Sequence, residues 1–201
     1  MTSRTEPARS GRPLGFDRAE VLTRLMALFW QTGYDRVTQQ QMAKASGLST
    51  SSLYNTFGTK AQTYRLAMDN YLEQMVAVLE PLTHGTRGRE DVLEMLDRLA
   101  HVLDTSQGRY GCMATTAMVA PVDEHIAQAT ERYRDHIREG FLKVAERARA
   151  LGENAPEPQT AANLMTAAVL GTMTIARAAP DSPELHAQLD ALRAFARNWV
   201  S

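Results

Sequence analysis

The chain has one cysteine and no apolar leader, and each of these absences narrows the class of protein. Cys112 is the only cysteine among 201 residues, so no disulfide can form within the chain. A lone thiol suits a reducing compartment. The first residues, MTSRTEPARSGRP, lack the apolar core of a signal peptide. We therefore expect a cytoplasmic protein.

A long apolar run is also missing. Residues 158–176 contain no charged side chain, and the length of this segment approaches that of a membrane span. It is rich in alanine and threonine, contains Gln159 and Asn163, and has few large apolar side chains. A helix buried against protein fits this composition better than a helix in lipid. We predict no membrane association.

Several enzyme motifs are absent as well. The sequence has no Gly-x-Ser-x-Gly, no glycine-rich phosphate loop and no His-Glu-x-x-His. His125 and His136 fall on one helix face, but their spacing along a helix separates them by about 16 Å, too far to bind one ion. We predict no catalysis, no metal and no cofactor; an all-α hydrolase or transferase is the alternative.

The charge that is present is unevenly distributed. Residues 1–60 carry eight basic and four acidic side chains, so this part has a net charge of +4 although the whole chain has −1. A basic front end on an acidic body favours local contact with a polyanion.

Apolar residues recur at helical spacing through most of the chain, and no segment shows the alternation of a strand. Asp17 is a suitable N-cap for the first helix, Gly33 ends it, and Pro81 closes a later one. We predict an all-α protein of about nine helices. Their expected ranges are 17–32, two short helices within 38–57, 60–79, 92–103, 112–119, 123–151, 158–178 and 183–200.

The most informative spacing lies in residues 39–58. A helix-turn-helix needs a small residue at the helix crossing, a residue that tolerates positive φ in the turn and an apolar anchor on the second helix. Ala43, Gly47 and Leu53 meet these needs in order. The second helix then exposes Thr50, Ser51, Ser52 and Asn55, short polar side chains that can reach base edges or phosphates. The alternative is a tight helical hairpin within a larger bundle.

The segments GRPLGFD and LFWQTGYDRVTQQQMAKASGLSTSSLYNTFGTKAQTY resemble the N-terminal domain of tetracycline-repressor (TetR) family regulators across roughly residues 11–65. The rest of the chain agrees in helix count, in length and in the Gly-Cys pair at Cys112. Two departures are Thr59, where serine is usual, and Ala61, where glutamate is common. The resemblance implies three parts: a flexible basic arm over 1–16, a helix-turn-helix domain over 17–60 and a helical effector-binding and dimerisation domain over 61–201.

The resemblance also implies site residues and partners. The partners would be a double-stranded DNA operator, a small-molecule effector and a second copy of the chain. The expected DNA contacts are Arg9 and Arg12 in a minor groove, Thr38, Tyr54 and Lys60 on phosphates, and Thr50, Ser51, Ser52 and Asn55 at the major groove. Tyr54 as a core aromatic and Lys60 as a solvated charge are the alternatives.

In the body, the family's ligand cavity implies effector contacts at Met68, Tyr71, Leu72, Met75, Leu99, Leu103, Cys112, Met113 and Thr116. Few basic residues lie on these helix faces, so we predict a mainly apolar, uncharged effector. Small residues that permit close helix approach favour a dimer interface at Leu164, Ala168, Gly171, Ile175, Leu192, Phe195 and Trp199.

The expected function is a repressor that binds a pseudo-palindromic operator as a dimer and is released by the effector. An alternative is a repressor that senses electrophiles or oxidants through Cys112. That role requires an exposed thiol with a lowered pKa. A buried, inert thiol is the simpler interpretation.

Overall fold

The computed structural model describes residues 16–179, 182 and 184–199, and within them it contains nine α-helices, one 3₁₀ turn and no strand. The all-α prediction is confirmed. The helices are α1 (Arg18–Thr32), α2 (Gln39–Ser46), α3 (Thr50–Phe57), α4 (Lys60–His84), α5 (Arg89–Leu103), α6 (Met113–Val119), α7 (Glu124–Ala150), α8 (Pro158–Ala178) and α9 (Glu184–Arg197), with the 3₁₀ turn at Gly108–Tyr110.

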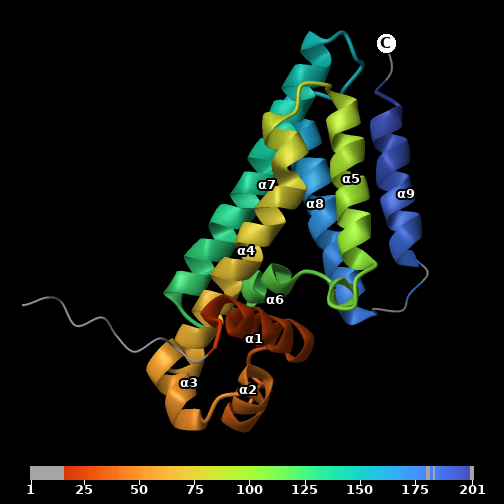
Figure 1. Cartoon of the computed structure of the whole chain (residues 1–201). Coiled ribbons are helices and arrows are strands. Elements are labelled where there is room, and N and C mark those ends of the chain that lie inside the picture. Colours follow the sequence, from red (N-terminus) through yellow and green to blue (C-terminus); the bar gives the residue numbers. More distant parts are fainter. Residues whose placement is uncertain (1–15, 180–181, 183, 200–201) are drawn as a thin grey trace, which may run out of the picture.

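Figure 1 shows α1, α2 and α3 gathered at one end of a longer helical body. The long helix α4 leaves this end and packs along α7, which in turn packs against α8. Helix α5 lies between α4 and α9. The short helix α6 lies where α1 meets the body, so it belongs to the junction of the two parts.

Side-chain caps explain where the N-terminal helices begin. The Asp17 carboxylate accepts hydrogen bonds from the free amides of α1, and the Ser49 hydroxyl does the same for α3. Thr38 and Thr59 each form a reciprocal capping box with a glutamine three residues on. The predicted start of the first helix after Asp17 is therefore confirmed.

The expected end of the fourth helix was wrong, because α4 continues past Leu79 to His84 with Pro81 inside it. Proline has no N–H, so a helical proline leaves the carbonyl four residues earlier without its usual partner. That carbonyl belongs to Ala77, and Arg98 of α5 donates to it at 2.9 Å. A side chain from the next helix thus satisfies the group that Pro81 leaves unpaired, and the helix is not broken.

A buried carboxylate fixes the start of α5 against α7. Asp91 is fully buried and accepts hydrogen bonds from the backbone N–H and the Nε of Arg87, at 2.8 and 3.0 Å. Arg147 of α7 pairs with the same carboxylate at 2.9 Å. The body is therefore held by an ionic cluster around Asp91 as well as by its apolar core. No helix among the described residues has both the length and the apolar character needed to cross a membrane.

Candidate nucleic-acid interface and ligand cavity

Helices α2 and α3 form a compact helix-turn-helix. Gly47 adopts φ +71°, the left-handed conformation that the turn requires, and its N–H closes α2 on the Ala43 carbonyl. Leu53 and Phe57 of α3 are buried, and Met42 of α2 is fully buried beside them. These anchors leave the opposite face of α3 free of apolar side chains.

That opposite face is exposed and polar. Thr50, Ser51, Ser52 and Asn55 are all exposed, and α3 lies at the outer end of the molecule (Figure 1). The Ser49 hydroxyl caps the first turn of α3. Its oxygen accepts a hydrogen bond from the Ser52 N–H at 3.2 Å and lies 3.1 Å from the Ser51 hydroxyl. The first turn of α3 therefore presents hydroxyls and a helix N-terminus on one surface, an arrangement suited to a phosphate-lined groove.

Tyr54 and Lys60 lie at the edges of this surface. Tyr54 is 61% exposed, so it is not a core aromatic. Lys60 is only half-buried, but its Nζ is held at 3.3 Å from the Asp35 carbonyl and 4.4 Å from the centre of the Tyr34 ring. It is thus positioned and not a freely solvated charge. Thr38 is exposed, and its oxygen accepts from the Gln41 N–H, which leaves its O–H to donate.

The predicted contacts of Arg9 and Arg12 lie outside the described residues. Two basic residues that the expected contact set omitted, Arg18 and Lys44, are exposed on α1 and α2. Arg18 lies over the Phe57 ring at 5.2 Å, which places it next to α3. Arg18 is the first residue of α1 and carried no spacing signal, because its contact with Phe57 exists only in the folded chain.

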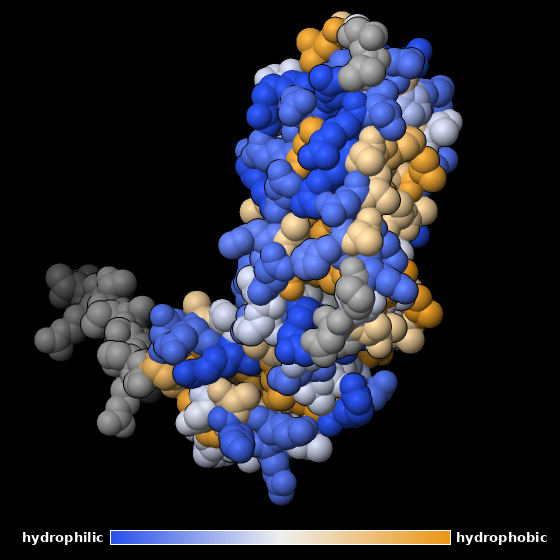
Figure 2. Space-filling model, turned by 90° about the vertical axis from the view of Figure 1, so that its right-hand side faces the viewer, coloured by the Kyte–Doolittle hydropathy of each residue, from blue (hydrophilic) through white to orange (hydrophobic). Residues whose placement is uncertain are grey.

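Helix α8 carries an uncharged exposed stripe. Leu164 is 50% exposed, Ile175 is 37% exposed, Gly171 is exposed and Ala168 is half-buried. Exposed alanines continue this surface on α9, at 187, 191 and 194. In Figure 2 apolar residues gather in a band along the edge of the face shown. The other predicted interface residues, Leu192 and Phe195, are half-buried.

Trp199 requires a correction. It is 2% exposed and packs edge-on against the Phe195 ring at 6.1 Å between ring centres. Because its ring is covered by its own chain, it belongs to the core and offers no surface to a second chain. Trp199 follows α9, whose buried residues are Leu185, Leu189 and Ala196.

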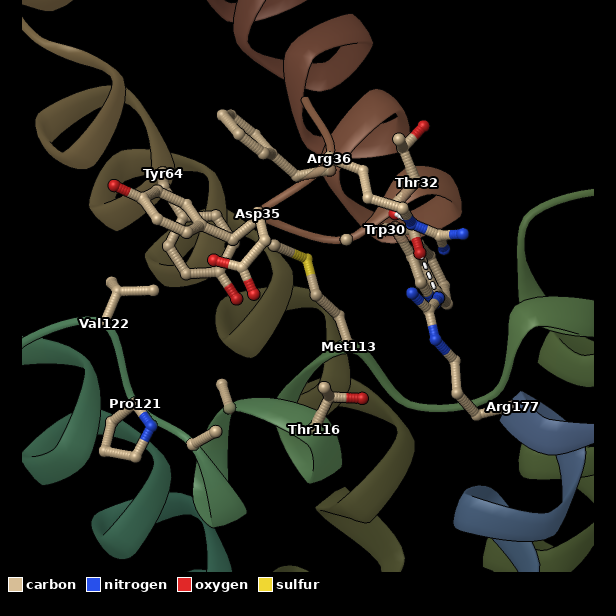
Figure 3. Close-up of a pocket in the computed structure, with 15 residues that line it drawn as sticks. Trp30, Thr32, Asp35, Arg36, Tyr64, Met113, Thr116, Pro121, Val122 and Arg177 are labelled. Atoms are coloured by element: carbon tan, nitrogen blue, oxygen red, sulfur yellow. Dashed lines mark hydrogen bonds between the residues drawn. The ribbon is translucent and has the colours of Figure 1, made fainter. Parts of the chain in front are cut away.

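A cavity of about 780 Å³ lies at the junction of α1, the 33–36 loop, α4, α6 and the end of α8. Apolar and aromatic side chains form much of its wall, with Asp35, Arg36 and Arg177 as the charged lining residues. A second cavity of about 500 Å³ lies between α4 and α7. Figure 3 shows the first cavity with its lining side chains.

The nine residues expected to contact an effector are distributed unequally. Met113 and Thr116 line the junction cavity, and Leu72 lines the second cavity. The other six are buried in the core: Met68, Tyr71, Met75, Leu99, Leu103 and Cys112. Residues of the junction cavity that the sequence reasoning missed include Tyr34, Tyr64 and Arg177. No sequence pattern groups these three residues, since they lie far apart in the sequence and only folding brings them together.

Trp30 and Arg177 connect α1 to the segment before α6 and to α8 beside this cavity. The Trp30 indole N–H donates to the Gly111 carbonyl at 2.7 Å, and Arg177 donates to the Trp30 carbonyl. Trp30 also packs edge-on against Tyr71 of α4, with ring centres 4.9 Å apart. These contacts fasten the N-terminal helices to the segment before α6 and to the last turn of α8.

Cys112 is 3% exposed. Burial raises the pKa of its thiol, and a hydrogen bond with Tyr71 offsets only part of that effect. A thiol that stays protonated and covered is a poor nucleophile. The geometry therefore favours the inert interpretation of Cys112 over the sensor.

An all-α chain with an exposed recognition helix, a basic front end and a larger helical body is a helix-turn-helix DNA-binding regulator by class. Residues 21–64 match the model of the bacterial regulatory proteins of the tetR family. The chain is also 28% identical to the uncharacterized HTH-type transcriptional regulator YezE of Bacillus subtilis (strain 168), over 71% of this chain and 75% of YezE. The chain is therefore similar to TetR-family regulators, most directly over residues 21–64.

Solved structures agree over almost the whole chain. A cysteine mutant of the TetR family transcriptional regulator CifR, complexed with 26 bp double-strand operator DNA, matches with a TM-score of 0.78 and 25% identity. The match covers 94% of this chain and 100% of CifR. A TetR transcriptional regulator from Chloroflexus aurantiacus matches in fold with a TM-score of 0.76 and 22% identity, over 91% and 95% of the two chains. The HTH-type transcriptional repressor ComR of Escherichia coli (strain K12) is 36% identical over a third of each chain.

The chain is therefore a DNA-binding transcriptional regulator. The family model and the relatives that the chain matches are transcriptional regulators and not enzymes, so they do not support the hydrolase or transferase alternative.

Proposed function

We propose that this chain is a dimeric repressor, that it binds a pseudo-palindromic operator through α3 and that a small molecule releases it. The observation that carries the DNA-binding part is the exposed polar face of α3, held by the buried anchors Leu53 and Phe57. The proposed contacts are Thr50, Ser51, Ser52 and Asn55 at the groove, with Thr38, Tyr54 and Lys60 on the flanking phosphates. Arg9 and Arg12 extend this set into the adjacent minor groove.

The dimer is proposed from the uncharged stripe of α8. Leu164, Ala168, Gly171 and Ile175 follow one face of the helix, and small residues at such positions let two helices approach closely. Leu192 and Phe195, half-buried on the neighbouring helix α9, complete the proposed interface. A two-fold dimer would present two α3 helices to successive turns of one DNA groove, which explains why the operator should be pseudo-palindromic.

Release is proposed as a shift between two conformations. An effector that binds better to the conformation with widely spaced α3 helices lowers the affinity for the operator. A coupling of about 1–3 kcal/mol weakens binding about 5- to 150-fold, which is enough to free a promoter. Helix α4 is suited to transmit the change, because it begins at Lys60 beside the DNA surface and ends at His84 in the body.

The DNA-binding part is tested by fluorescence anisotropy with the chain's own upstream intergenic DNA. We expect tight, salt-dependent binding to that duplex and much weaker binding to a scrambled duplex of equal length. The matched pair of variants is Asn55→Ala on the exposed face of α3 and Gln128→Ala on the exposed face of α7. Only the first should lose affinity; an equal effect of both would contradict a DNA surface on α3.

The dimer is tested with Gly171→Arg. Nothing lies within 4 Å of a Cβ added at Gly171, so the substitution fits the single chain while placing a charge on the proposed interface. Light scattering during size exclusion should give twice the 22.3 kDa chain mass for the wild type and for a Gln128→Arg control. It should give a single chain for Gly171→Arg. A dimer that survives this substitution would place the interface elsewhere.

A further inference from the structure

The junction cavity contains two arginines that come from different parts of the molecule. Arg36 lies in the loop before α2, and Arg177 lies in the last turn of α8. Neither forms an ion pair with a carboxylate of the described residues. Figure 3 shows their guanidinium groups at the same end of the cavity. Two positively charged guanidinium groups therefore line the junction cavity, and neither is paired with a carboxylate of the described residues.

The backbone contacts of these arginines hold them without neutralising them. Arg36 donates from Nε to the Thr32 carbonyl at 2.9 Å. Arg177 donates to the Trp30 carbonyl and, at 3.5 Å, to the Tyr110 carbonyl. Burial, and then the nearby charge of Arg36, lower the pKa of Arg177. A guanidinium in this position gains from an anion that accepts from both arginines.

The rest of the cavity limits what that anion can be. Away from the arginines most of the wall is apolar or aromatic, with Phe29, Tyr64, Met113, Ala117 and Val122, and Thr116 adds a hydroxyl. The one acidic lining residue, Asp35, lies beside Tyr64 in Figure 3, away from Arg177. A volume of about 780 Å³ is within the range of small-molecule sites. The cavity thus combines a cationic end with an apolar body.

We propose that this cavity binds a small organic carboxylate, whose anionic group bridges Arg36 and Arg177 and whose apolar part lies against Phe29 and Met113. The inference rests on the proposed function in one respect, since it makes this carboxylate the effector. It replaces the mainly apolar, uncharged effector that the sequence led us to expect. The arginine pair could not be seen there, because only folding brings the loop before α2 to the end of α8.

Such a ligand would act directly on the junction. Arg36 belongs to the N-terminal helices that carry α3, and Arg177 belongs to the body. A carboxylate bound by both competes for the Arg177 donors that now hold the Trp30 carbonyl. Binding therefore changes how α1 is fastened to α8, and with it the placement of α3.

Trp30 lines the cavity and provides the signal for a test. In a Trp199→Phe background it is the only tryptophan, and its fluorescence reports binding without DNA. The probes are phenylacetate, cinnamate and octanoate, each compared with its primary amide. We expect saturable quenching by at least one acid and at least tenfold weaker binding of its amide.

The variants separate the site from a general charge effect. Arg36 is exposed, so Arg36→Gln should leave the fold intact and weaken the acid about tenfold to hundredfold. Arg132→Gln, which changes an arginine of the second cavity, should leave binding unchanged. The proposal would be overturned if every amide bound as tightly as its acid. It would also be overturned if Arg36→Gln left the affinity for the acids unchanged.

The operator titration is then repeated with the best acid. A loss of operator affinity that Arg36→Gln abolishes supports the effector role. An acid that binds without changing operator affinity overturns that role. If no acid binds while the operator titration still succeeds, this inference fails and the proposed repressor function stands.

Discussion

The bond between Trp30 and Gly111 joins the N-terminal helices to the body, and its removal should lower stability by a measurable amount. Trp30→Phe keeps an aromatic ring against Tyr71 but deletes the indole N–H that donates to the Gly111 carbonyl at 2.7 Å. Gly111 is buried, so its carbonyl would lose its partner without access to water. Leaving a buried acceptor unpaired costs about 1–3 kcal/mol.

The chain supplies its own control. Trp199 is buried to a similar extent, yet its indole N–H has no hydrogen-bond partner among the described residues. Trp199→Phe therefore removes a similar volume and no hydrogen bond. The difference between the two variants corrects for the smaller ring, and the unpaired N–H that Trp199→Phe removes can only enlarge it.

The assay is urea unfolding at one fixed protein concentration, because association contributes to the stability of a dimer. Trp30→Phe should lower the free energy of unfolding by about 1–3 kcal/mol more than Trp199→Phe. In a thermal scan the same difference corresponds to a midpoint about 2–12 °C lower for a chain of this size. Equal destabilisation of the two variants would refute the claim that this bond fastens α1 to the body.

Three other changes test the site. Lys60→Ala should weaken binding to every duplex and reduce the slope of log affinity against log salt by about one unit, because one phosphate contact is lost. Anisotropy titrations at several salt concentrations measure this slope. An unchanged slope would contradict the phosphate contact. Ser51→Ala should change which bases are preferred in a panel of operator variants, and an unchanged preference would count against base readout there. Cys112 should stay unreactive toward a thiol reagent in the native protein and react once per chain in denaturant, since burial raises the pKa of its thiol. If quinones released the operator and Cys112→Ser abolished this release, the sensor alternative would be restored.

Local sequence patterns predicted most of the helices and the expected DNA-binding surface. Asp17 acts within three residues of its own position, so its capping role could be predicted directly from the sequence. The turn at Gly47 and the anchor at Leu53 depend on spacing within one short motif. Such features need no knowledge of distant contacts.

The features that were missed depend on contacts between distant segments. Pro81 does not end α4, because Arg98 from another helix satisfies the carbonyl that the proline leaves free. Trp199 is covered by its own chain, and a helical stripe does not reveal which residues of a face stay exposed. The junction cavity is assembled from α1, α4, α6 and α8, so no local pattern could have indicated Arg36 and Arg177 as neighbours.

The central claim is that α3 reads an operator as part of a dimer, and selection from random DNA tests it most directly. Full-length protein would be incubated with a library of random duplexes, and the bound fragments would be sequenced after several rounds. The account predicts one enriched motif with two inverted half-sites, separated by one helical turn of DNA or a multiple of it. A library that yields no motif, or a single half-site without symmetry, would contradict it.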